Sequence, residues 1–126
     1  MFLELKNIIK NCYAPYSNFK VSACVVTRDN KKYFGVNVEN SSYGASVCAE
    51  RVSVLNAISM GEEKGNFKEI HIYSESLDYV MPCFLCRQTF VEFFDNDTLI
   101  YVYDKDGNSK CYTMDMICPL PFSMEN

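Results

Sequence analysis

The chain has 126 residues, a length typical of one domain, and we expect residues 1–126 to fold as one unit. Its 48% hydrophobic and 22% charged residues are ordinary for a soluble globular protein, and no apolar run is long enough to span a membrane. The net charge of -4 argues against a polyanionic partner such as a nucleic acid, because proteins that bind one usually present a basic surface.

Seven cysteines, an odd number, are a poor fit to a framework of disulfide bonds. The N-terminal segment also lacks a signal-peptide core, since Glu4 and Lys6 interrupt its apolar residues. We therefore expect a reduced, cytoplasmic protein, in which clustered cysteines more often bind a metal or take part in chemistry.

Hydrophobic spacing and turn residues divide the chain into short elements. In chain order they are a helix over 2–12, a turn at 14–18, a strand over 19–27, a returning strand over 33–40, a loop ending at Ser46 as N-cap, a helix over 47–60, a strand within 67–76, a helix over 83–94, two strands within 97–114 and a tail over 117–126. Mixed strands with helices on both faces predict an α/β fold, a three-layer α/β/α sandwich around a five-stranded mixed sheet. The last two strands must be antiparallel, because only a short Asp-Gly turn joins them.

Three cysteines stand at predicted helix starts, Cys48 on one helix and Cys83 and Cys86 on another. The Pro-Cys-x-x-Cys sequence places two sulfurs one helical turn apart, and the positive helix ends favour thiolates. Zinc accepts such ligands, and three of them leave its fourth position for water, as in catalytic sites. His71, the only histidine, lies in the middle of a strand and is expected to be a packed residue.

Glu50 follows Cys48 by two residues, which would place its carboxylate beside the zinc without making it a ligand. A carboxylate there can take a proton from water and deliver it to a leaving group. Arg51 and Arg87 also lie next to members of this group. Three thiolates on a dication leave a net negative charge, which a guanidinium that donates to sulfur would offset.

Other interpretations of the same residues are open. Each cysteine could be a small buried hydrophobic residue, and Cys-x-x-Cys alone could be redox-active. It could also be half of a structural zinc site that Cys111 and Cys118 complete. The combination is more specific than its parts, because ligand-x-Glu followed by Pro-Cys-x-x-Cys is the established signature of zinc deaminases.

The sequence resembles the cytidine deaminases of the short, homotetrameric, zinc-dependent type, nearly from end to end. The similar segments are the opening loop and first strand at 13–23, the stretch 35–51 with the first zinc ligand, the second zinc helix at 82–93 and the tail at 119–124. The resemblance implies a cytidine deaminase-like fold with one Zn²⁺ per subunit. It also implies hydrolysis of cytidine and 2′-deoxycytidine to uridine and 2′-deoxyuridine, with release of ammonia, in pyrimidine salvage.

The resemblance also implies roles for individual residues. Cys48, Cys83 and Cys86 would hold zinc, and Glu50 would move protons between water, the base N3 and the leaving amino group. The implied substrate contacts are Asn37 and Glu39 at the ribose hydroxyls, Phe19 stacked on the pyrimidine, the backbone of Ala49 at its N3/N4 edge, and Phe122 reaching into a neighbouring subunit's site. Tyr16 and Tyr43 are expected to line the site or a subunit contact. Ser46 and Val47 are expected to lie near the site, with no assigned role.

Core packing is the alternative for the two phenylalanines, and a polar strand end is the alternative for Asn37 and Glu39. Phe84 and Leu85 depart from the family, which often has small residues there; their bulk could tighten the wall of the site and alter the substrate preference that the resemblance implies. The remaining cysteines, for which a free thiol is the simpler interpretation, are Cys12, Cys24, Cys111 and Cys118.

Rival functions share this chemistry or this metal. Nucleic-acid deaminases usually have histidine as first ligand and a helix between the last two strands, and neither is expected here. A deoxycytidylate deaminase would need a phosphate-binding motif, which we do not find. A deaminase of an aminoacyl-nucleoside antibiotic is a closer rival. A non-catalytic zinc-binding interaction module is an alternative of a different class, against which Glu50 and the three-ligand count argue.

Overall fold

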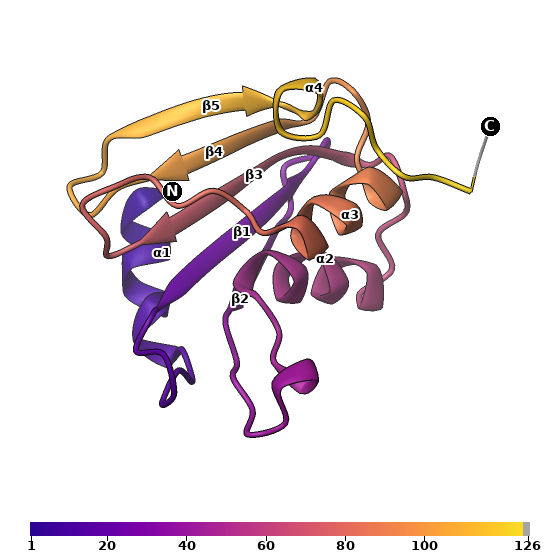
Figure 1. Cartoon of the computed structure of the whole chain (residues 1–126). Coiled ribbons are helices and arrows are strands. Elements are labelled where there is room, and N and C mark those ends of the chain that lie inside the picture. Colours follow the sequence, from indigo (N-terminus) through magenta and orange to yellow (C-terminus); the bar gives the residue numbers. More distant parts are fainter. Residues whose placement is uncertain (125–126) are drawn as a thin grey trace.

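The computed structural model describes residues 1–124 and is built around one sheet of five strands in the order β2-β1-β3-β4-β5 (Figure 1). The strands are β1 (Val21–Thr27), β2 (Lys32–Val36), β3 (Phe67–Ser74), β4 (Leu99–Tyr103) and β5 (Ser109–Thr113). β3 and β4 are parallel and the other neighbouring pairs are antiparallel, which confirms the mixed sheet and its final hairpin. The last two residues of the expected tail, 125–126, lie outside the described residues.

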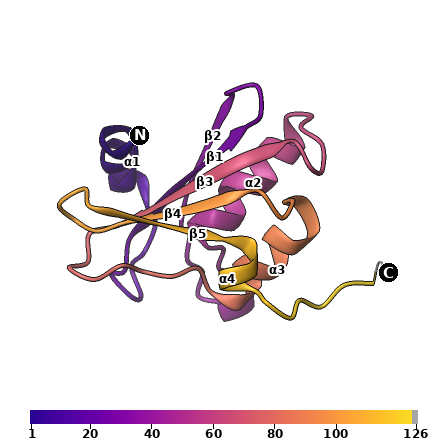
Figure 2. The ribbon, with the colours of Figure 1, turned by 90° about the horizontal axis from the view of Figure 1, so that it is seen from above.

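Helices cover both faces of the sheet (Figure 2). On one face lie α1 (Phe2–Ile8) and the short 3₁₀ helix η1 (Ile9–Asn11), and on the other lie α2 (Ala49–Ser59) and α3 (Phe84–Phe93). All seven residues of β1 are buried, because this strand is covered on both sides. The predicted three-layer α/β/α sandwich is therefore confirmed. No helix within residues 1–124 is both long and apolar enough to cross a membrane.

The start of α2 differs from the prediction. Ser46 was the expected N-cap, but the N-cap is Cys48 and the helix begins at Ala49. The reason is a two-way backbone bridge: Val38 N donates to Val47 O, and Val47 N donates to Val38 O. This bridge keeps the chain extended up to Cys48, which therefore lies at the helix entrance with its side chain free of capping.

A close approach between β2 and α2 fixes the position of that helix entrance. A Cβ atom on Gly35 would lie 2.5 Å from Ser53 N and 2.6 Å from Ala49 O. No side chain fits in that space, so glycine alone lets the strand backbone pack directly on the first turns of α2. The first turn, which carries Glu50, is thereby held against the sheet.

The start of α3 is held from two sides. Cys83 is its N-cap and accepts a hydrogen bond from Cys86 N at 3.4 Å. Arg87 donates to Pro82 O at 2.8 Å and to Ile117 O at 2.7 Å. Ile117 ends α4 (Met114–Ile117), a short helix within the segment expected to be a strand end and a tail. The chain beyond the sheet therefore folds back to fix the position of the second cysteine pair.

Candidate active site

Three sulfurs from two helix entrances converge in the described structure. Cys48 lies at the N-terminus of α2, and Cys83 and Cys86 lie in the first turn of α3. The Sγ atoms of Cys48 and Cys83 are 3.6 Å apart, those of Cys83 and Cys86 are 3.2 Å apart, and all three lie within 4.8 Å of one another. Within residues 1–124, neither Cys111 nor Cys118 joins this group, so the four-cysteine structural site is not formed.

The sulfur arrangement fits a zinc ion. Tetrahedral zinc with Zn–S bonds of about 2.3 Å separates its sulfur ligands by about 3.8 Å, close to the distances found here. Within residues 1–124 the group has three thiols and no fourth protein ligand, which is the donor set of a catalytic rather than a structural zinc site. The group therefore fits one zinc ion per chain.

Hydrogen bonds within the cluster favour a thiolate at Cys48. A hydrogen bond from Cys86, aided by those from Cys83 and Arg51, lowers the pKa of Cys48 to about 5. The same bond to Cys48, together with burial, raises the pKa of Cys86. Without a metal the cluster thus carries its negative charge at Cys48, and a zinc ion would draw the other thiols to the thiolate form as well.

Glu50 lies beside the sulfurs and is almost completely buried, with 6% of its surface exposed. Burial, aided by the negative charge of Cys48, raises the pKa of Glu50 to about 7. A carboxyl group tuned to neutrality can both accept and donate a proton at physiological pH. This is the property that the predicted proton-transfer role requires.

The two arginines occupy different positions. Within residues 1–124, Arg51 Nε is the buried side-chain nitrogen that lacks a hydrogen-bond partner, and its guanidinium helps to lower the pKa of Cys48. Arg51 also donates to Ser46 O at 3.3 Å. Arg87 instead donates to main-chain carbonyls and lies over the ring of Phe84, 4.6 Å from its centroid. Arg51 is therefore the arginine placed to offset charge on the sulfurs, and Arg87 ties down the start of α3.

A cavity of about 290 Å³ opens beside the cluster. The predicted site residues that line it are Phe19, Asn37, Glu39, Ser46, Val47, Cys48, Ala49, Glu50 and Cys83. They come from the loop before β1, the segment after β2 and the entrances of α2 and α3. Folding therefore brings residues of both predicted motifs, and the predicted substrate contacts other than Phe122, to one cavity.

Asn37 and Glu39 hold the loop that carries Phe19. Asn37 Oδ1 accepts from Val21 N at 2.9 Å, and its Nδ2 donates to Phe19 O at 2.7 Å. Glu39 Oε1 accepts from the amides of Tyr16 and Ser17 at 2.9 and 3.1 Å. These side chains are more than a polar strand end, because they fix the approach to the cavity as well as lining it.

Several other expected residues lie outside this cavity. Phe122 does not line it and is 67% exposed on the tail, where its carbonyl accepts from Gln88. Tyr16 and Tyr43 line an adjoining cavity of about 340 Å³, which shares Glu39 with the first.

The expectation for Phe84 and Leu85 is wrong for this chain. Their side chains are 76% and 64% exposed and do not line the cavity, so they cannot tighten its wall. They follow the N-cap Cys83 in the first turn of α3, whose exposed face carries them away from the site.

Sequence reasoning missed part of the lining: Ser17, Val21, Val80 and Met81. Val80 and Met81 directly precede the Pro-Cys-x-x-Cys motif, so adjacency to a ligand was an available signal. Ser17 lies two residues before Phe19 in the opening loop, and its position depends on a contact with a distant residue, Glu39.

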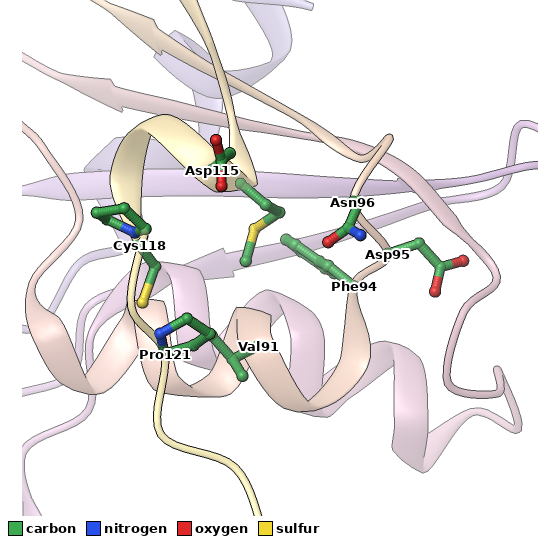
Figure 3. Close-up of a pocket in the computed structure, with 9 residues that line it drawn as sticks. Val91, Phe94, Asp95, Asn96, Asp115, Cys118 and Pro121 are labelled. Atoms are coloured by element: carbon green, nitrogen blue, oxygen red, sulfur yellow. The ribbon is translucent and has the colours of Figure 1, made fainter. Parts of the chain in front are cut away.

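Another cavity, of about 210 Å³, lies between the C-terminal end of α3, α4 and the tail (Figure 3). Val91, Cys118 and Pro121 border it on one side, and Asp95 and Asn96 on the other. It contains none of the clustered sulfurs and none of the predicted substrate contacts. The chemistry therefore belongs to the cavity beside Glu50.

His71 is a packed residue, as predicted. Its Nδ1 lies 2.8 Å from Tyr103 Oη, its Nε2 contacts Glu69, and its ring stacks on Tyr101 at 4.7 Å. It pairs in register with Cys24, whose side chain belongs to the core under α1. The histidine therefore lies on the face of the sheet opposite to the sulfurs.

The site thus has the parts of a zinc-dependent deaminase: clustered thiols, a buried carboxyl of neutral pKa and an adjoining cavity. The model of a protein family described as the cytidine and deoxycytidylate deaminase zinc-binding region matches residues 1–102. Because this match covers most of the chain, the chain belongs to the cytidine and deoxycytidylate deaminase family. The resemblance to the cytidine deaminase family noted in the sequence is thereby confirmed.

Individual relatives agree with this assignment. The cytidine deaminase of Mycoplasma genitalium is 35% identical over 112 residues, which span 89% of this chain and 85% of that protein. The cytidine deaminase of Sporosarcina psychrophila is 32% identical over 126 residues, spanning 100% of this chain and 91% of the relative. The crystal structure of cytidine deaminase from Burkholderia pseudomallei superimposes with a TM-score of 0.89 at 36% identity, covering 94% of this chain and 93% of that one.

Proposed function

We propose that this chain, as one catalytic domain, hydrolyses cytidine and 2′-deoxycytidine to uridine and 2′-deoxyuridine and releases ammonia, as a step of pyrimidine salvage. The observation that carries the proposal is the single cavity lined by Cys48, Glu50, Asn37 and Glu39. It combines a metal-ligand group, a proton carrier and polar groups suited to a sugar. The cytidine deaminase relatives support the choice of substrate.

Cys48, Cys83 and Cys86 would hold the zinc ion, which supplies a Lewis acid that makes water nucleophilic near neutral pH. Arg51 would offset the charge of three thiolates, because its guanidinium lies beside Cys48 and its buried Nε has no hydrogen-bond partner within the described part of the chain. Arg87 would keep the α3 entrance in place through its bonds to Pro82 and Ile117.

Glu50 would carry the protons of the reaction. It would take one from the attacking water and pass it to N3 of the base, which makes C4 more electrophilic. It would then move the proton of the hydroxyl group added at C4 to the amino group, so that the C4–N bond breaks, ammonia leaves and C4 keeps the oxygen as a carbonyl. Its burial and its pKa near neutrality support both directions of transfer.

The other lining residues would hold the nucleoside. Phe19 would stack on the pyrimidine, and the backbone of Ala49 would meet its N3/N4 edge, because both residues line the cavity beside Glu50. Asn37 and Glu39 would bind the ribose hydroxyls. Among the described residues, no lysine or arginine lines this cavity or the adjoining one, which supports a nucleoside rather than a nucleotide substrate.

We also propose a homotetramer in which Phe122 reaches a neighbouring subunit's site and Tyr43 lies at a subunit contact. Their side chains are 67% and 95% exposed, and neither lines the cavity beside Glu50 in its own chain. Light scattering of the purified protein should give four times the chain mass. We propose a cytoplasmic location, because seven free cysteines, three of them clustered, require a reducing environment to keep the ligands as thiols.

The direct test follows ultraviolet absorbance and ammonia as purified, zinc-loaded protein meets cytidine, 2′-deoxycytidine and deoxycytidine 5′-phosphate. We expect absorbance loss and one ammonia per nucleoside, with the nucleotide at least about tenfold slower because no cation binds its phosphate. Loss with neither nucleoside would overturn the proposal. An aminoacyl-cytosine nucleoside, assayed in parallel, would then show whether the antibiotic rival is correct, and the absence of any ammonia would favour the non-catalytic zinc module.

A further inference from the structure

The opening loop of the site has little apolar burial to hold it in place. Of residues 13–20, Ala14 alone is buried. Phe19, the expected stacking ring, is 45% exposed. Asn18 adopts a left-handed conformation with φ of 58°, which turns the chain toward β1. The conformation of such a loop must depend on its polar contacts.

Besides the bonds of Asn37 to Val21 N and Phe19 O, several of those contacts involve Ser17. Its hydroxyl donates to Glu39 Oε2 and accepts from Phe19 N at 3.0 Å. Its own amide, with that of Tyr16, donates to Glu39 Oε1. One hydroxyl therefore connects the carboxylate and the aromatic residue that face the same cavity.

The hydrogen-bonding capacity of Glu39 leaves room for a substrate. A carboxylate has about four acceptor positions, two on each oxygen. The amides of Tyr16 and Ser17 occupy both acceptor positions of Oε1. The Ser17 hydroxyl occupies one of the two acceptor positions of Oε2. No hydrogen bond from residues 1–124 occupies the remaining position on Oε2, which can therefore accept from a hydroxyl group in the cavity.

We propose that Ser17 is a positioning residue for nucleoside binding. Its hydroxyl holds Glu39 so that the free acceptor position of the carboxylate meets the ribose 3′-hydroxyl. The same hydroxyl also fixes the backbone of Phe19. The inference rests on the proposed function, because it takes Glu39 as the ribose contact. It goes further because it assigns the alignment of Glu39 to Ser17, a residue outside the two zinc motifs. The serine acts through Glu39 and Phe19 and does not take part in the proton transfers.

The test compares Ser17→Ala with wild type on 2′-deoxycytidine and on 2′,3′-dideoxycytidine, which lacks the 3′-hydroxyl. We expect kcat/KM for deoxycytidine to fall about tenfold, mainly through KM, since a binding contact is lost. The dideoxynucleoside should lose at most about threefold, because Glu39 has no sugar hydroxyl to accept from. Ser17→Thr, which keeps the hydroxyl, should stay within about threefold of wild type. Ser41→Ala, a matched change in the adjoining cavity, should have no effect.

Equal losses on the two nucleosides, or no loss with deoxycytidine, would overturn the inference. A readout that needs no turnover separates this failure from failure of the proposed function. The hydrogen bond from the Ser17 hydroxyl is the main reason that the pKa of Glu39 is lowered. NMR titration of the carboxyl group should therefore show a higher Glu39 pKa in Ser17→Ala than in wild type. An unchanged Glu39 pKa contradicts the contact itself. A wild type that turns over neither nucleoside contradicts the proposed function and, with it, the assignment of the ribose.

Discussion

Each face of the sheet has a thiol close to ionisable groups, half-buried at Cys48 and buried at Cys24, and the two differ in opposite directions from an ordinary cysteine. On the α2/α3 face, hydrogen bonds from neighbouring thiols and Arg51 lower the pKa of Cys48 to about 5. On the α1 face, burial raises the pKa of Cys24 to about 12. Burial alone therefore makes a cysteine inert, whereas converging donors make it a thiolate that can bind metal.

The carboxyl groups differ in the same way. Glu69 contacts His71, which in turn bonds Tyr103, so the network on the α1 face is satisfied within the chain. Glu50 on the other face borders a cavity, and the nearby Arg51 Nε has no hydrogen-bond partner among residues 1–124. A polar cluster whose groups are all paired stabilises the fold, whereas one with an open cavity and unused groups is suited to binding and chemistry.

Removing a single thiol group from either face tests this contrast and has the largest expected effect. Cys48→Ala removes one of three ligands, so we expect less than about 0.1 zinc per chain and at least about 1000-fold lower turnover. Elemental analysis and the ultraviolet assay measure both.

Cys24→Ala is the matched control, because it removes a sulfur from the other face of the sheet. It should keep its zinc and its rate within about twofold and lose about 1–2 kcal/mol of unfolding free energy to a small cavity. Full zinc occupancy in Cys48→Ala would contradict the ligand assignment.

The pH dependence of stability tests the environment of Glu50 in the metal-free protein. Its pKa is raised from 4.5 to about 7. The folded chain therefore holds this proton more tightly than the unfolded chain, and the resulting stability is present below pH 4.5 and lost as pH rises through about 7. Relative to Glu50→Gln, wild type should lose about 3 kcal/mol over this window.

Urea unfolding with chelator and reductant, from pH 4.5 to 8, measures the difference between the two proteins. Both carry the same cysteines, so thiol titration contributes to both curves. Curves that run parallel across the window would show that Glu50 is not desolvated in the folded chain.

A smaller effect is expected on the α1 face. Tyr103→Phe removes the hydroxyl that lies 2.8 Å from His71 Nδ1 and leaves that nitrogen without its partner. We expect a loss of about 1–2 kcal/mol in urea unfolding, with zinc content and kcat/KM unchanged. Tyr13→Phe, which alters an exposed ring, should cost less than about 0.5 kcal/mol. A large loss of activity in Tyr103→Phe would mean that the two faces are coupled.

The sequence predicted the elements of the fold and the metal group well, for a local reason. Ligand-x-Glu and Pro-Cys-x-x-Cys are short spacings, and each lies at a helix entrance that hydrophobic periodicity locates. The hairpin of β4 and β5 was predictable from its short turn, which permits no parallel crossover. These features need no knowledge of distant contacts.

The errors and omissions came from pairings between distant residues. Ser46 was misassigned as N-cap because the bridge between Val38 and Val47, which keeps the chain extended, does not appear as a local pattern. Ser17 was missed because its partner Glu39 lies 22 residues away. Phe84 was expected to face the site, and the direction of a side chain in a first helical turn depends on how the whole helix is packed.

The central claim is that metal binding and proton transfer belong to different residues of one cavity. Glu50→Ala tests it most directly, with zinc content and turnover of cytidine measured on the same preparation. We predict about one zinc per chain and a kcat at least about 1000-fold below wild type. Turnover like that of wild type would contradict the role of Glu50, and loss of zinc together with activity would show that Glu50 supports the metal instead of moving protons.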